Sequence, residues 1–186
     1  MKQANLLLFF TALAALGIFG PTPAFGSLAP STLSDLIADS DLIVQAHVIQ
    51  LGNEIPGMGL VSFAVLRVQR IFKGTYDQGT VRIEFEPEFH EQLITTLQYD
   101  RLLFLKKTPD GTYAGTQYGR SYWPLIWVAG AERKLVTPYV YPTSLIAVPD
   151  TLIKEAEVMA PEPGLEKHRI KAIYLDGLIP LLGVEQ

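Results

Sequence analysis

The side chains of this sequence best suited to acid–base or metal chemistry are its three histidines, His47, His90 and His168. His90 lies among glutamates, and a histidine with two carboxylates is a donor set for a transition-metal ion. The spacing argues against such a site, because Glu86 lies on an extended stretch whereas Glu88 and Glu91 begin a predicted helix. Glutamates in a first helical turn are already favoured by the helix dipole. We therefore predict no metal site.

Recognisable catalytic motifs are also lacking. Ser121 has no Gly-x-Ser-x-Gly context and no neighbouring base. The sequence contains no phosphate-binding loop and no dinucleotide fingerprint, so we predict no cofactor. His47 lies in an apolar run, where we expect a hydrogen-bonded core or rim histidine rather than a ligand. We therefore predict a non-catalytic binding or scaffold module. The alternative is an envelope hydrolase of unrecognised type, with a site assembled from distant residues such as Glu86, His90 and Arg120.

Two stretches have the composition of a contact surface. Residues 53–59 form a predicted loop, and loops carry function more often than the elements they connect. Residues 119–127 contain both tryptophans with a tyrosine and an arginine, which are the residue types enriched at interface hot spots. The candidate partner-binding residues are Asn53, Ile55, Met58, Tyr122, Trp123 and Trp127. The alternatives are that Met58 packs on the rim of the domain and, as we favour, that the tryptophans cover one end of it.

The N-terminal residues predict the cellular location of the protein. Lys2, the apolar residues 6–19 and the small residues Ala24 and Gly26 follow the plan of a secretory signal peptide at residues 1–26. We expect export to the periplasm or the extracellular space; the alternative is a retained membrane anchor, for which the apolar run is short. The net charge of −4 disfavours nucleic acid. We therefore expect a protein partner in the cell envelope.

A mainly β domain at residues 27–118 must position the candidate residues. Its predicted strands span residues 41–51, 60–72, 80–86, 101–106 and 112–118. A helical pattern at residues 87–98 falls between the third and fourth strands, as in the five-stranded Greek-key barrel of the OB type. In the second strand we place Val61, Phe63 and Val65 on the inner face, with a bulge near residues 66–68.

A short helix is expected before the first strand, at residues 33–38. Thr32 and Asp35 have the spacing of a capping box, which satisfies backbone donors at a helix start.

Three parts of the barrel sequence resemble netrin-like modules. They are residues 38–48, residues 68–74 with their Phe-Lys-Gly ending, and residues 99–105. Such modules also occur in tissue inhibitors of metalloproteinases, and the pattern is similar to that of small exported bacterial proteins. The resemblance covers residues 33–118 and implies an OB barrel that contacts partners through the loop after its first strand. The inhibitors chelate zinc through an N-terminal cysteine; this chain has no cysteine, so their activity is not implied.

Residues 119–186 are predicted to form a C-terminal extension packed on the barrel. Residues 134–148 favour one or two short strands. Helical patterns are predicted at residues 151–158 and 165–175. The apolar tail at residues 178–182 is expected to dock on the domain.

Overall fold

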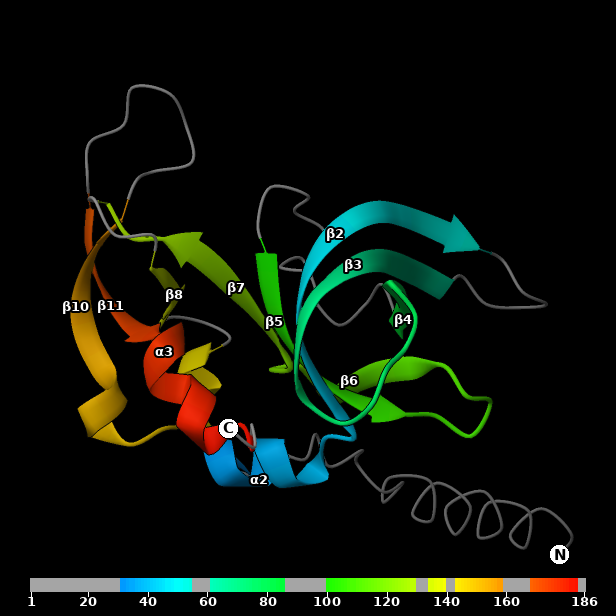
Figure 1. Ribbon diagram of the computed structural model, residues 1–186, viewed down its shortest axis with the longest axis horizontal. Coiled ribbons are helices and arrows are strands. Elements are labelled where there is room, and N and C mark those ends of the chain that lie inside the picture. The colour runs from blue at the N-terminus through cyan, green and yellow to red at the C-terminus, as the bar shows by residue number, and fades with distance from the viewer. Residues whose placement is uncertain are drawn as a thin grey trace, which may run out of the picture.

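Figure 1 shows the computed structural model of the chain, which describes residues 31–54, 61–85, 100–129, 134–139, 143–158 and 168–183. The predicted signal peptide, most of the loop at residues 53–59 and the helix predicted at residues 87–98 lie outside the described residues.

Within the described chain, five strands close into a barrel, which confirms the predicted fold class. They are β2 (Leu42–Glu54), β3 (Val61–Lys73), β4 (Thr80–Phe85), β5 (Asp100–Lys107) and β6 (Tyr113–Gly119). Antiparallel pairs join β2 to β3 and β5, and β3 to β4. β6 closes the ring by pairing antiparallel with β5 and, at Ile83 and Tyr113, parallel with β4. This Greek-key order is the one predicted, and the barrel lies to the right in Figure 1.

Apolar side chains from the strands fill the barrel interior. Its buried members are Leu42, Val44, Ala46, Val48, Ala64, Leu66, Val81, Ile83, Leu103 and Leu105, with Tyr122 from outside the barrel. The inner face predicted for the second strand is therefore wrong, because Ala64 and Leu66 point inward. Phe63 lies on the other face, where the Arg82 guanidinium sits 4.1 Å from its ring centroid. Both faces of β3 are apolar at this point, so alternation alone could not choose between them.

A second core lies outside the barrel wall. Leu102 and Phe104 of β5 face this core, while Leu103 and Leu105 face the barrel interior. Strands buried on both faces are continuously apolar, as these four residues are. The cover includes α2 (Leu33–Asp39), with Leu33 and Leu36 buried, and α3 (Leu175–Leu178), which lies above α2 in Figure 1. The predicted first helix and its capping box are confirmed.

The Phe-Lys-Gly ending of β3 fastens α2 to the barrel. Phe72 is buried in the second core, and the Lys73 ammonium donates to the α2 carbonyl oxygens of Ile37 and Ala38 at 2.6 and 3.2 Å. Gly74 has a φ of 83°, and a Cβ there would lie 2.3 Å from the Asp41 carbonyl oxygen. Packing and backbone conformation thus account for all three residues.

The extension continues the barrel sheet rather than forming a separate layer. β7 (Tyr122–Trp127) pairs with β5, and β8 (Leu135–Pro138), β11 (His168–Tyr174) and β10 (Ile153–Val158) follow in order. Val128, just past β7, forms a bridge with Val158 of β10, so these strands curl around a third apolar cluster. Two short strands, β1 (Ser31–Thr32) and β9 (Ile146–Ala147), pair in parallel nearby.

The extension contains short strands and a helix, as predicted, but the helix is α3 and the two residue ranges predicted as helical are wrong. Residues 151–158 form the end of the 3-10 turn η3 (Asp150–Leu152) and then strand β10, and residues 168–174 form strand β11. Ala156 and Val158 are buried while Glu155 and Glu157 are exposed, which is the period of a strand. Cross-strand pairing with β11 overrides the helix propensity of the Lys and Glu residues.

The predicted docking of the apolar tail is confirmed. Leu178 ends α3, and Leu182 follows the 3-10 turn η4 (Ile179–Leu181); both are fully buried in the second core. A further 3-10 turn, η2 (Thr143–Leu145), precedes β9. In the part of the chain that the structure describes, none of the helices is long and apolar enough to cross a bilayer.

Candidate functional site

The predicted contact residues that the structure describes lie on two strands, Asn53 on β2 and the three aromatic residues on β7. Ile55 and Met58 lie outside the described residues, and Asn53 belongs to β2, where its backbone faces that of Ser62. Tyr122 and Trp123 are buried, with 1% and 0% of their surface exposed, so neither offers an area to a partner. Trp123 donates from Nε1 to the Arg120 carbonyl oxygen at 2.8 Å and packs on Phe104, with ring centroids 5.0 Å apart. The burial of Trp123 fits the alternative in which the tryptophans cover the domain, but Trp127 does not share it.

Trp127, at the end of β7, is the predicted residue that reaches solvent. Its exposed fraction is 51%, although its neighbours Leu125 and Leu135 pack in or against the second core. Leu125 lies directly opposite Asp100 of β5, so Trp127 is a diagonal neighbour of Asp100 on the same face of the sheet. A large side chain at such a position is within reach of the residues around Asp100.

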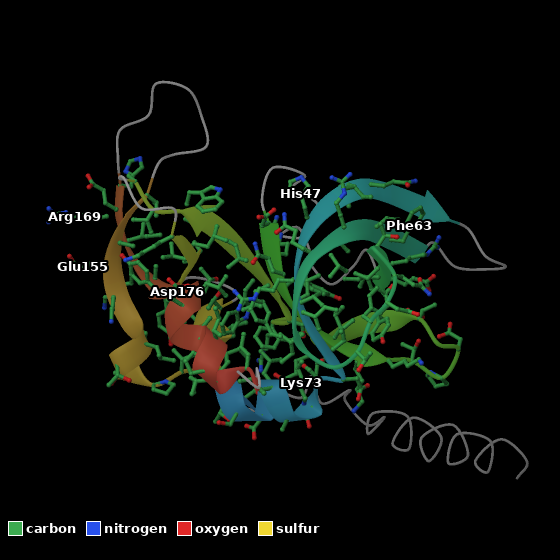
Figure 2. All side chains as sticks on the ribbon, viewed as in Figure 1. His47, Phe63, Lys73, Glu155, Arg169 and Asp176 are labelled. Atoms are coloured by element: carbon green, nitrogen blue, oxygen red, sulfur yellow. The ribbon has the colours of Figure 1, made fainter. Side chains whose placement is uncertain are left out.

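A cluster of polar side chains surrounds Asp100 on the outside of the barrel, and we call it the polar face. Its members come from β2, β3 and β5 and are Gln45, His47, Arg67, Gln69, Arg70 and Asp100. Figure 2 places His47 at the upper end of the barrel wall, away from α2. The sequence pattern did not single out this cluster. The available signal was the set of polar residues interrupting two otherwise apolar strands.

Hydrogen bonds hold the Asp100 carboxylate in place. Its Oδ1 accepts from Gln69 Nε2 at 3.1 Å and is 2.8 Å from His47 Nδ1; its Oδ2 is 3.4 Å from Gln45 Nε2. Gln45 also donates to Gln69 Oε1 at 2.7 Å. The Asp100 side chain is only 16% exposed, while that of His47 is 38% exposed. The network therefore fixes the imidazole and commits its Nδ1 to Asp100, as predicted for a hydrogen-bonded rim histidine.

The two arginines of the polar face are exposed. Arg67 lies opposite His47, and Arg70 lies opposite Gln45 with its guanidinium 5.0 Å from the Phe72 ring centroid. Among the described residues, neither arginine pairs with a carboxylate. Among the described members of the polar face, two arginines outweigh the one carboxylate of Asp100. The described part of this face is therefore locally positive, in a chain whose net charge is −4.

Among the described residues, the polar face does not assemble a complete catalytic device. A carboxylate that holds His Nδ1 orients the general base of serine hydrolases. Here the hydrogen-bond partners found for His47 in the described chain include no hydroxyl or thiol side chain. Of the residues considered for a hydrolase, Glu86 and His90 lie outside the described chain, and Arg120 lies at the turn between β6 and β7. The described residues contain no group of three His, Cys, Asp or Glu that could hold a metal ion.

A groove on another surface is a second candidate for a binding site. It encloses about 550 Å³ between α2, the segment after β9, and η4. Its lining residues are Thr32, Leu33, Ser34, Ile37, Ala38, Ala147, Val148, Pro149 and Leu181. These side chains include no titratable group, so the groove offers apolar contact and two hydroxyls but no acid–base chemistry.

Comparison with known proteins found no matching family model, no similar curated protein and no similar solved structure.

Proposed function

We propose that this protein is an exported, non-catalytic binding module whose partner is a protein of the cell envelope. One observation carries this proposal: the barrel interior is packed with side chains, while Trp127 stands exposed beside the polar face. Small barrels of this kind use their interior as a core. The groups left for function are then those on the outer surface.

The composition of that surface supports protein recognition. Trp and Arg are enriched among residues that dominate binding energy at protein interfaces. The hydrogen-bond network around Asp100 holds His47 and the two glutamines in a fixed arrangement, so less side-chain entropy is lost on binding. The resemblance to netrin-like modules supports the same class of function, and the signal-like residues 1–26 support export.

The test is capture of envelope proteins on the immobilised protein, with Trp127→Ala as the main variant. Leu145→Ala is the matched control, since Leu145 is also an exposed apolar residue, at 39%, but belongs to η2. We expect a protein that is retained by wild type and by Leu145→Ala and is lost with Trp127→Ala. Equal retention by all three forms, or no retained protein, would contradict binding through this surface.

A further inference from the structure

We infer that the partner presents an acidic polypeptide segment, whose carboxylates bind Arg67 and Arg70 while an apolar side chain covers Trp127. This inference rests on the proposed function and names the chemistry of the partner. It uses the one part of the described surface that combines exposed arginines, a fixed hydrogen-bond network and an exposed tryptophan.

A β-bulge places both arginines on the same face. Arg67 and Arg70 are three residues apart in β3, a spacing that puts side chains on opposite faces of a regular strand. The register with β2 skips Gln69, because Gln45 faces Arg70 whereas Ala46 faces Val68. The extra residue places Arg70 on the same face of the sheet as Arg67. Bulges commonly change the direction of side chains in this way. The irregularity therefore creates the pair of positive groups.

The charge balance of the polar face favours a carboxylate ligand. The oxygens of Asp100 contact His47, Gln69 and Gln45, and among the described residues neither arginine forms an ion pair with this carboxylate. Arg70 is held over the Phe72 ring, which leaves the edge of its guanidinium for a planar, bidentate partner. Carboxylates match that edge geometry, and the bond is stronger than one between neutral groups.

The same observations argue against nucleic acid as the occupant. Binding to a phosphate backbone depends on many Lys and Arg contacts along a basic stripe. The polar face has two arginines and one carboxylate, on a chain with a net charge of −4. Trp127 adds an apolar anchor, which suits a polypeptide that alternates acidic and apolar residues.

The experiment measures binding of a fluorescent glutamate–tyrosine copolymer to the full protein by anisotropy. The main variant combines Arg67→Gln with Arg70→Gln. The matched control combines Lys154→Gln with Arg169→Gln, which removes the same charge from exposed positions on β10 and β11. Figure 2 shows Arg169 at the edge of the extension, far across the view from His47. Thermal melts of each variant verify folding.

We expect wild type to bind the copolymer, the main variant to lose about tenfold in affinity and the control to change less than about twofold. Arg67→Lys should retain most of the binding. Trp127→Ala should lower the affinity for the copolymer but leave the affinity for plain polyglutamate unchanged. Equal losses in the two double variants would reveal a net-charge effect and overturn the inference. No binding to wild type, or tighter binding of dextran sulfate through the same arginines, would also overturn it.

The copolymer and capture measurements together separate an acidic partner from a partner of other chemistry. If the copolymer does not bind but envelope capture still depends on Trp127, the partner is not acidic and the binding module stands. If both measurements fail, the outer surface around Trp127 is not a binding site.

Discussion

The outer side of the barrel wall has two halves that differ within a single strand. In the covered half, Ile43 and Phe104 face each other beneath the helices and are fully buried. In the open half, His47 and Asp100 face each other on the same two strands and hydrogen-bond near solvent. The boundary falls at Gln45, which lies opposite the buried Leu102. The two halves share a backbone and a sheet face, so their side chains and the helix cover make the difference.

This contrast separates the part of the wall that stabilises the fold from the part that is available for binding. Each Å² of apolar surface removed from water contributes about 25 cal/mol, and the covered half supplies such surface from both sides. Exposed hydrogen bonds and charges contribute little net stability, because water competes for the same groups. The open half therefore contributes mainly fixed positions for polar groups.

The largest expected effect on stability comes from comparing the two tryptophans, because Trp123 is buried and Trp127 is half exposed. Trp123→Ala should lower the free energy of unfolding by about 3–5 kcal/mol, because it opens a cavity beside Phe104. Trp127→Ala should lower it by less than about 1 kcal/mol, since half of that side chain is already exposed. Urea denaturation of both variants measures the difference. Similar losses would mean that Trp127 belongs to the core and that the two halves are not distinct.

The barrel was predictable from the sequence because local signals and topology agree there. Strict alternation at residues 80–85 places Val81 and Ile83 inside, and the capping box marks the start of α2. The extension was harder, since its strands β10 and β11 depend on partners distant in sequence. Ile153 faces Ile173 across that pair, a contact that no local pattern encodes.

The polar face was less predictable than the fold. The sequence predicts that His47 is hydrogen-bonded. Its partner Asp100 lies 53 positions away, after the helix predicted at residues 87–98, so no local pattern links the two. The shared orientation of Arg67 and Arg70 depends on which residue is bulged, and the sequence placed the bulge at residues 66–68 instead of at Gln69. Bulge position is set by pairing with a neighbouring strand, so it is a tertiary property.

The next effect concerns the backbone at the end of β3, beside the covered half. Gly74→Ala should destabilise by more than about 1 kcal/mol, because it combines a φ of 83° with a Cβ 2.3 Å from the Asp41 carbonyl oxygen. Gly111→Ala has the positive φ without the clash and should lose about 1 kcal/mol. Gly79→Ala has neither feature and should be neutral. The three chemical denaturation midpoints should follow this order. A Gly74 variant no less stable than the Gly111 variant would show that the close approach of Gly74 to the Asp41 backbone adds no constraint.

The smallest effect is a pH dependence at the start of α2, the helix that covers the wall. The Thr32 hydroxyl and backbone N–H donate to Asp35 at 2.7 and 3.0 Å, and these bonds lower the pKa of that carboxyl below its usual 3.8. A lowered pKa in the folded state means that the stabilisation is present at neutral pH and is lost as pH falls through the folded-state pKa. Asp35→Asn should therefore be less stable than wild type at pH 7, and the gap should close in acid.

The matched control for this effect is Asp39→Asn, at the other end of α2. An acidic side chain there faces the negative end of the helix dipole, so its removal should be neutral or slightly stabilising at pH 7. Urea midpoints between pH 7 and pH 3 measure both variants against wild type. If the wild-type and Asp35→Asn curves stay parallel into acid, the capping box does not help to hold α2 over the covered half. The contrast between the two halves would then depend on the buried Leu33 and Leu36 and on Lys73 alone.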